Sequence, residues 1–307
     1  MSTESRQLAA LTFCAATVPS ILILPRAGWL WAGLAAFLAG VLFLLARPLG
    51  SLGEKPKKIT KILLLPLLLW NLMALGSAAR VLCGAFPGAG PLIGLLLLLL
   101  SAYAAGSGLH VILRSASVLF FLLLPVYGTL MAFSLPDLQM KRLAPVLGTD
   151  WRLLPSCLII MLTLLLPGDR KGKGWCFWLV GSAFLALLAA LVTSGMGAQD
   201  FYTASKSVSV FSAMERLEPL VSAALTMGGF CMLGLICSVN EKIFPLWGLR
   251  KYGGFLNFFP AAGFFFLTEK LPSALLAAGT AIFWGFWPFL LLSIENLKKL
   301  KKLSKNP

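Results

Sequence analysis

Residues 7–25, QLAALTFCAATVPSILILP, and residues 27–46, AGWLWAGLAAFLAGVLFLLA, decide the fold of this chain, because neither run contains a charged residue. Only Arg26 separates them. A helix needs about 20 mainly apolar residues to cross the roughly 30 Å hydrocarbon layer of a membrane, and each run has about that length. Neither run alternates between apolar and polar residues, as the strands of a membrane β-barrel do. The opening of the chain therefore predicts two membrane-spanning helices.

The same pattern continues along all 307 residues. Hydrophobic residues make up 59% and charged residues 12% of the chain, and the mean hydropathy is +0.89; soluble chains carry about 25% charged residues. We therefore predict an all-α integral membrane protein with about ten transmembrane helices, forming a single polytopic domain over residues 1–307. The ten charge-free intervals of at least 16 residues are 7–25, 27–46, 62–79, 81–113, 115–136, 153–168, 174–199, 219–240, 252–268 and 271–294.

The basic residues predict how the chain is oriented. If the N terminus is cytoplasmic and ten spans alternate, 18 of the 26 basic residues fall on the inner side and 8 on the outer side, as the positive-inside rule requires. Both termini are then cytoplasmic, and residues 295–307 form a basic cytoplasmic tail. We expect the basic inner loops to contact anionic lipids. Because the net charge of +15 is distributed in this way, we expect no nucleic-acid partner.

Ten spans divide into two sets of five, and an odd number per set inverts the second set relative to the first. This arithmetic predicts an inverted-repeat transporter fold, with a first repeat at about 7–136 and a second at about 152–294. In such folds the substrate site lies near the midplane, where the first helix of each half is broken. Pro19 and Pro155 mark the corresponding positions, which are candidates for irregular backbone. A proline kink without a ligand is the alternative at Pro19.

The charge-free intervals offer little for catalysis. They contain no Asp or Glu and a single histidine, His110, so we predict no catalytic residues, no metal site and no cofactor. The six cysteines show no CxxC spacing, and we interpret them as small buried apolar residues. A proton-coupled carrier usually places an ionisable group within its bundle, and no carboxylate within the intervals meets that need.

Polar side chains inside the spans are the remaining candidates for ligand contact. Pro19 lacks a backbone N–H and is expected to leave carbonyls near Cys14, Ala15 and Ala16 for a ligand, a water molecule or a neighbouring group. Hydroxyls in membrane helices most often bond their own backbone, whereas the carboxamide of Asn71 needs either a neighbouring helix or a ligand site. The candidate ligand-binding residues are Thr17, Pro19, Ser20, Asn71, Ser156, Thr163, Ser222 and Thr226.

Several short motifs together resemble one family, the spore germination permeases, which are the B subunits of GerA-type nutrient germinant receptors. Their order and spacing agree with that family from about residue 6 to residue 300. Where the family often has a glycine-rich stretch at the first break, this chain has Val18, Pro19 and Ser20. The motifs are Arg6-Gln7-Leu8, Leu24-Pro25-Arg26-Ala27 followed by Trp29, GLHVILRS at 108–115, LAPVLG at 143–148, and Glu215-Arg216 within MERLEP at 214–219.

The resemblance implies the fold of the amino acid-polyamine-organocation (APC) superfamily, with ten helices in two inverted sets of five. It also implies that the chain binds a small nutrient such as an amino acid and signals to the A and C subunits of the receptor. The implied location is the inner (cytoplasmic) membrane of the spore or cell. Two alternatives belong to other classes: a working amino-acid transporter of the same superfamily, and a scaffold subunit that binds no ligand.

Overall fold

The computed structural model describes residues 2–49, 52, 58–83, 90–134, 139–143, 151–168, 174–198, 203 and 218–303. These residues are almost entirely helical, and no strand occurs among them. Within this part of the chain, seven helices are long and apolar enough to cross a membrane, and two shorter apolar helices cover Pro91–Gly106 and Arg152–Leu165. The prediction of an all-α, multi-pass membrane protein is confirmed at this level. The seven are Thr3–Ala27, Trp29–Leu49, Lys58–Cys83, Leu109–Thr129, Gly174–Met196, Pro219–Trp247 and Ser273–Asn296.

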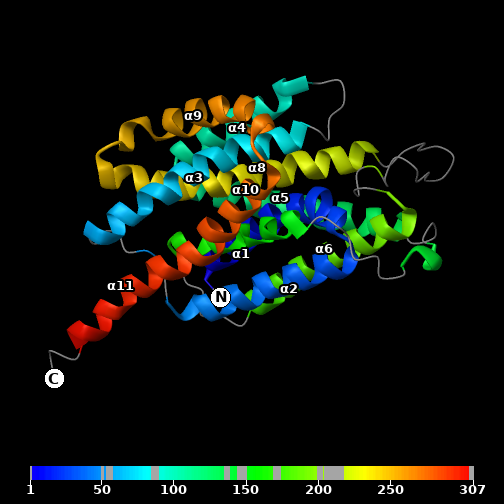
Figure 1. The fold of residues 1–307 in the computed structure, drawn as a ribbon, viewed down its shortest axis with the longest axis horizontal. Coiled ribbons are helices and arrows are strands. Elements are labelled where there is room, and N and C mark those ends of the chain that lie inside the picture. The colour runs from blue at the N-terminus through cyan, green and yellow to red at the C-terminus, as the bar shows by residue number, and fades with distance from the viewer. Residues whose placement is uncertain are drawn as a thin grey trace.

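The helices form one bundle whose members run mostly along its long axis (Figure 1). Several apolar spans are built from more than one kind of helix, with π and 3-10 segments joined to α-helices. In chain order the elements are α1 (Thr3–Val18), η1 (Pro19–Ile23), η2 (Leu24–Ala27), α2 (Trp29–Ala46), η3 (Arg47–Leu49), α3 (Lys58–Cys83), α4 (Gly90–Gly106), α5 (Leu109–Ser134), η4 (Met140–Leu143), η5 (Trp151–Leu165), α6 (Gly174–Met196), α8 (Glu218–Ile243), η6 (Phe244–Trp247), η7 (Arg250–Tyr252), α9 (Gly253–Leu267), η8 (Thr268–Lys270), α10 (Ser273–Thr280), η9 (Ala281–Phe286) and α11 (Trp287–Leu303).

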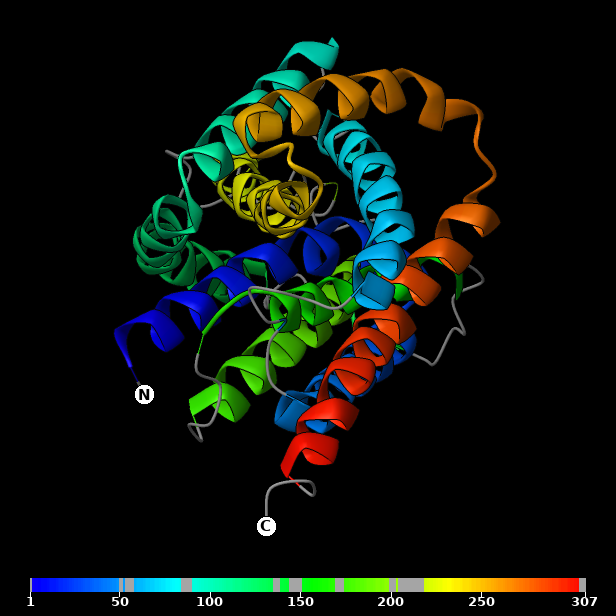
Figure 2. The ribbon, with the colours of Figure 1, turned by 90° about the vertical axis from the view of Figure 1, so that its left-hand side faces the viewer.

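The first span lies at the centre of the bundle. In its most apolar stretch 94% of the residues are buried, against 22% in the span that follows it. A helix that is apolar on every side is stable only where it is surrounded, and α1 packs against α5, α6, α8 and η5. Figure 2 shows α1 crossing between a group formed by α3, α4, α8 and α9 and a group that contains α2 and α6.

The outer helices carry apolar side chains that face away from the protein. Phe37 on α2, Phe121 on α5 and Phe177 on α6 are each more than half exposed. A soluble monomer rarely exposes large contiguous apolar surface, and such surface marks contact with a membrane or a partner. The distribution of exposed phenylalanines therefore agrees with a bundle that is surrounded by lipid.

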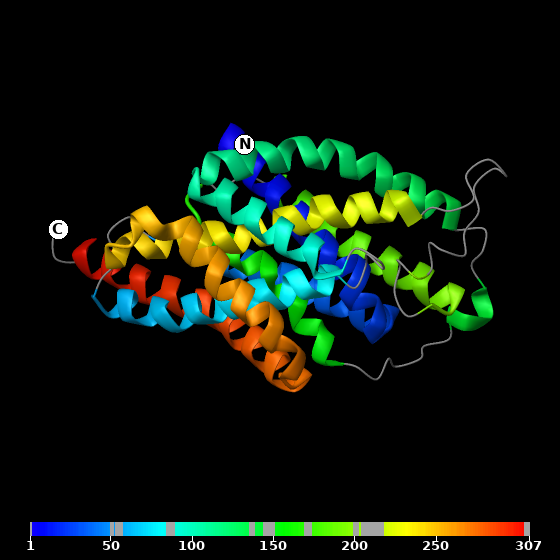
Figure 3. The ribbon, with the colours of Figure 1, turned by 90° about the horizontal axis from the view of Figure 1, so that it is seen from above.

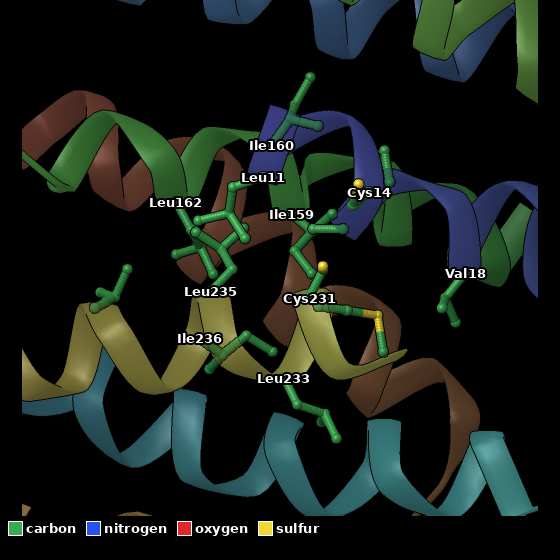
Figure 4. Close-up of a cluster of buried hydrophobic side chains, with 14 of the residues drawn as sticks. Leu11, Cys14, Val18, Ile159, Ile160, Leu162, Cys231, Leu233, Leu235 and Ile236 are labelled. Atoms are coloured by element: carbon green, nitrogen blue, oxygen red, sulfur yellow. The ribbon is translucent and has the colours of Figure 1, made fainter. Parts of the chain in front are cut away.

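Helices that are distant in the sequence pack in definite pairs. α2 lies against α6, α3 lies against both α8 and α9, and α4 also lies against both α8 and α9. Figure 3 shows α8 running through the middle of the bundle, with α5 on one side and α3 on the other. The core between α1, η5 and α8 is filled by aliphatic and thiol side chains, including Leu11, Ile159 and Leu235 (Figure 4).

The backbone departs from the α-helix at Pro19, as predicted. α1 ends at Val18, a π-helical segment follows over Pro19–Ile23, and a 3-10 turn over Leu24–Ala27 completes the span. Proline cannot donate a backbone hydrogen bond, and its ring clashes with the carbonyl four residues earlier. Gly28 then turns the chain with φ of 91°, in the region that glycine adopts without a side-chain clash.

The sixth interval is also irregular, because all 15 residues of η5 form a 3-10 helix. At about 2.0 Å per residue these residues extend over about 30 Å, close to the thickness of the hydrocarbon layer. The same residues in an α-helix would extend over about 22 Å. The stretched conformation gives the shortest charge-free interval the length of a crossing.

Some predictions fall on residues that the structure does not describe. Residues 144–148 of the LAPVLG motif and Glu215-Arg216 lie outside the described residues, as do residues 304–307 of the basic tail. Much of the basic charge assigned to the inner loops also lies there, so contact with anionic lipids stays a prediction. The basic residues concerned are Lys55, Lys57, Arg170, Lys171, Lys173 and Lys305.

Candidate functional site

A cavity of about 210 Å³ lies where the broken first span meets the beginning of η5. Pro19 and Ser156, two of the predicted ligand-binding residues, both line it. Further walls come from α3, α10 and η9, and α8 contributes Met232. The cavity is therefore built by helices from both halves of the chain.

Two tryptophans form much of the polarisable wall of the cavity. Trp70 of α3 stacks on Phe283 with a centroid distance of 5.4 Å, and its ring lies directly over Gly279, where a Cβ would collide with it. Trp284 of η9 donates its indole N–H to Oδ1 of Asn71 at 3.0 Å. The Trp70 indole N–H is buried and has no hydrogen-bond partner among the described residues.

The mouth of the cavity carries positive charge. Arg26 of η2 and Arg152 of η5 both line it and are exposed, and Nη1 of Arg152 donates to Oγ of Ser273 at 3.2 Å. Among the described residues that line the cavity there is no Asp or Glu. A guanidinium group presents donors in a fork that matches a carboxylate. The cavity thus combines a cationic mouth with an apolar and aromatic body.

The size of the cavity limits its occupant. Pockets for drug-sized ligands occupy about 300–1,000 Å³, and this cavity is smaller. The geometry suits a compound of a few heavy atoms that carries a negative group at one end.

The hydroxyl groups at the Pro19 break are used within the protein. Thr17 donates to the carbonyl of Cys14 at 2.6 Å, and Ser20 donates to the carbonyl of Ala16 at 2.7 Å. These are two of the carbonyls that the break was expected to leave for a ligand or a neighbouring group. In the structure, both carbonyls accept a hydrogen bond from a hydroxyl of the first span itself. Pro19 lines the cavity.

Thr163, Ser222 and Thr226, three more of the predicted residues, do not line the cavity. Thr163 donates to the carbonyl of Ile160 at 2.7 Å, and Thr226 donates to the carbonyl of Ser222 at 2.8 Å. Ser156 also bonds its own element, donating to the carbonyl of Leu153 at 2.7 Å. Of the eight predicted residues, the structure therefore brings Pro19 and Ser156 together at the cavity wall.

Asn71 lies behind that wall and takes the neighbouring-helix alternative. Its Oδ1 accepts from Trp284, and its Nδ2 donates to Oδ1 of Asn240 on α8 at 2.9 Å. Asn240 in turn donates to Asn257 of α9 at 2.9 Å, and Asn257 donates to Oε1 of Glu241 at 3.0 Å. All three asparagines are fully buried.

The sequence analysis did not single out Asn240, Asn257 or Trp284 of this cluster, or Arg152 at the mouth of the cavity. Asn240 and Asn257 fall inside the charge-free intervals 219–240 and 252–268, so the same argument that singled out Asn71 applied to them. Trp284 and Arg152 carried no comparable local signal, because tryptophan and arginine are both common near membrane interfaces.

The described residues hold no group of three or more His, Cys, Asp or Glu side chains arranged to bind a metal ion. No protein-family model matches this chain, and no curated protein matches it. The resemblance to the spore germination permeases therefore rests on the motifs quoted above.

Proposed function

We propose that this chain is the permease-like membrane subunit of a nutrient germinant receptor in the inner membrane of the spore. One observation carries the proposal: a small cavity with a cationic mouth lies between the Pro19 break and the beginning of η5. In the proposed fold these are the first helices of the two repeats, and this is where such folds bind their substrates.

The nutrient in this proposal is a small amino acid. Its carboxylate lies toward Arg26 and Arg152, because guanidinium groups are the charged partners at the mouth. Its side chain contacts the apolar wall formed by Leu22, Ile159 and Trp284. The small volume favours compounds with short side chains over large aromatic amino acids.

Some of the contacts between helices agree with two equivalent sets of five, although the extensive contacts of α1 and α5 with α8 have no counterpart of similar extent. If each element corresponds to the one five crossings later, α3 corresponds to α8 and α4 corresponds to α9. The contact of α3 with α9 then corresponds to the contact of α4 with α8, and both contacts exist. In the same way the contact of α1 with α5 corresponds to that of η5 with α10, and the contact of α1 with α6 corresponds to that of η5 with α2.

Hydrogen bonds between helix ends support the alternating arrangement of ten crossings. Trp175 donates to Ser5 at 3.1 Å, which joins two ends assigned to the cytoplasmic side. Arg152 bonds Ser273, and Arg142 donates to the carbonyl of Met196 at 2.8 Å. These two bonds join ends assigned to the outer side, so the mouth of the cavity opens outward in this arrangement.

Signalling in this proposal follows from a difference in affinity. A ligand shifts a protein between two arrangements only if it binds one of them more tightly. The nutrient, held between η1 and η5, stabilises one arrangement of the two helix sets. The A and C subunits then detect that arrangement.

A working amino-acid transporter is the second candidate, and one observation favours it. Glu241 is a half-buried carboxylate near the end of α8, and it is joined by hydrogen bonds to the three buried asparagines. An ionisable group linked into a membrane bundle is the kind of group that proton-coupled carriers use. Under this alternative, the same cavity would release its occupant to the cytoplasm.

Germination of spores that lack this gene distinguishes the two functions. The spores are scored against single amino acids and sugars, and uptake of the same compounds is followed in growing cells. The receptor proposal predicts that the response to one nutrient is lost while uptake stays normal. Lost uptake with normal germination would establish the transporter.

Binding to the purified protein tests the site itself. The Arg152→Gln variant is expected to bind the nutrient identified in the spore assay at least about tenfold more weakly, because hydrogen bonds to charged groups contribute about 1.5–3 kcal/mol. Arg142→Gln is the matched control, since Arg142 is an exposed arginine that bonds the carbonyl of Met196 away from the cavity. Equal affinities for the two variants would exclude the cavity as the binding site.

A further inference from the structure

Five side chains form a continuous hydrogen-bonded chain from the cavity wall to the end of α8. Trp284 donates to Asn71, Asn71 to Asn240, Asn240 to Asn257, and Asn257 to Glu241, at 3.0, 2.9, 2.9 and 3.0 Å. The members come from α3, α8, α9 and η9, so the chain crosses four elements. We refer to these five residues as the carboxamide chain.

The two ends of the carboxamide chain determine the direction of every bond in it. An indole N–H can only donate, and an ionised carboxylate can only accept. Trp284 therefore holds Oδ1 of Asn71 toward itself, which turns Nδ2 of Asn71 toward Asn240, and the same step repeats at Asn257. Turning one carboxamide alone would place two donors or two acceptors face to face. The orientation at either end is thus linked to the orientation at the other.

The Trp284 end lies on an irregular element. Trp284 lines the cavity and belongs to the π-helical segment Ala281–Phe286. π-helical segments are uncommon single-turn insertions that occur frequently at functional sites. An occupant of the cavity contacts the ring whose N–H begins the carboxamide chain.

The Glu241 end lies where α8 and α9 meet. The carboxylate of Glu241 lies directly over Gly253, the first residue of α9, where a Cβ would collide with it. Nδ2 of Asn257 also donates to the carbonyl of Cys237 on α8 at 3.5 Å. The start of α9 is therefore held to α8 by the last members of the chain.

We propose that the carboxamide chain couples the wall of the cavity to the junction of α8 and α9, so that displacing Trp284 loosens the start of α9. Of the five residues of the carboxamide chain, Trp284 alone lines the cavity. The three asparagines therefore act as positioning residues. The inference deepens the proposed function and rests on it for its biological role, because a change at the junction of α8 and α9 becomes a signal only if a partner subunit detects it.

The coupling is testable without a ligand. A thiol placed by Tyr252→Cys lies at an exposed position beside Gly253, and a water-soluble maleimide reports how open this junction is. The protein is reconstituted in lipid nanodiscs, and labelling is followed by the mass of the peptide, so that the native cysteines stay in place. Trp284→Phe keeps an aromatic ring and removes the indole N–H. We expect it to raise the labelling rate about threefold or more, the size of effect that moderate coupling between sites produces.

Trp287→Phe is the matched control. Trp287 lies on the same span and donates its indole N–H to the carbonyl of Leu63 at 2.7 Å, outside the carboxamide chain. We expect this variant to leave the labelling rate within about twofold of the parent. Equal rates in the two tryptophan variants would overturn the proposal.

The reverse direction gives an independent measurement, because coupling between sites is reciprocal. A thiol placed by Ser77→Cys lies at the cavity wall, and Glu241→Ala removes the far end of the chain. The labelling rate at this position is expected to rise about threefold. Glu295→Ala is the control, because Glu295 is a carboxylate that accepts from Thr60 of α3 at 3.3 Å and is outside the chain. The same rise with Glu295→Ala, or no rise with Glu241→Ala, would overturn the proposal.

These measurements separate the inference from the proposed function. If the labelling is coupled but loss of the gene does not change germination, the carboxamide chain links the two sites and the receptor role is wrong. If Arg152→Gln weakens nutrient binding but the labelling is uncoupled, the cavity is the binding site and the carboxamide chain does not link it to α9.

Discussion

The bond between Trp284 and Asn71 makes the sharpest stability prediction. The perturbation is a double-mutant cycle made of Trp284→Phe, Asn71→Leu and the two together. Leucine has the same branched skeleton and the same number of side-chain heavy atoms as asparagine but makes no hydrogen bond, and phenylalanine keeps an aromatic ring while losing the donor. The cycle therefore isolates the bond from most of the packing.

The magnitude follows from burial and geometry. Trp284 is 6% exposed and Asn71 is 0% exposed, and Nε1 of Trp284 lies 3.0 Å from Oδ1 of Asn71. A buried donor left without a partner costs about 1–3 kcal/mol in soluble proteins, whereas hydrogen bonds between membrane helices average about 0.6 kcal/mol and reach about 1.7 kcal/mol. Because the bond is one of four in a polarised series, we expect a coupling free energy of about 1 kcal/mol. Asn71→Leu alone disrupts two bonds and is expected to cost about 2 kcal/mol.

The assay is equilibrium unfolding in mixed micelles with increasing SDS, followed by helical circular dichroism and evaluated as the free energy of unfolding. A second cycle pairs Asn71→Leu with Trp287→Phe, which removes an indole bond to the backbone of Leu63. Since Asn71 and Trp287 share no bond in the structure, their effects should add within about 0.5 kcal/mol. A coupling energy near zero in the first cycle, or one equal to that of the control cycle, would refute the reasoning.

The close approach of α1 and α8 depends on Gly228, where a Cβ would collide with Oγ1 of Thr17; Gly228→Ala should therefore lower the free energy of unfolding by about 1–3 kcal/mol. Gly40→Ala, where an added Cβ would meet no atom within 4 Å, should leave it unchanged or raise it by up to about 1 kcal/mol, and equal losses in the two variants would contradict the packing. The ten-crossing arrangement predicts that single cysteines at Lys171 and Lys206, in a cysteine-free background, are labelled from opposite sides of the membrane. Labelling of both from one side would exclude that arrangement.

The sequence predicted the part of the site that depends on local chemistry. Proline removes a backbone donor wherever it stands in a helix, so residues 7–25 alone made Pro19 a candidate for irregular backbone. Pro66, Pro125 and Pro260 lie within continuous α-helices, so the sequence did not decide which proline interrupts its span. The position of Asn71 in a hydrocarbon segment likewise required a polar partner, although its identity stayed open. The tendency of hydroxyls to bond their own helix, stated from the sequence, holds for Thr163 and Thr226.

The choice of partners lay beyond the reach of the sequence. Asn71 and Asn240 are 169 residues apart, and Trp284 and Asn71 are 213 residues apart. Hydropathy describes how each segment interacts with its solvent, which is lipid here, and carries no information about which segments face each other. The gathering of Arg152 and Trp284 around Pro19 was therefore not predictable from spacing.

The sequence by itself determined that this chain is helical and where its apolar spans lie, because length and charge act locally along the chain; it also offered Pro19 as a candidate for irregular backbone. Tertiary structure alone decided that α1 is the central helix, that η5 forms a 3-10 helix, and that the cavity forms beside both. It also decided that three buried asparagines and a tryptophan satisfy one another. The physical reason is that a buried polar group requires a partner but does not specify which one, and only the packing of distant helices brings the partners together.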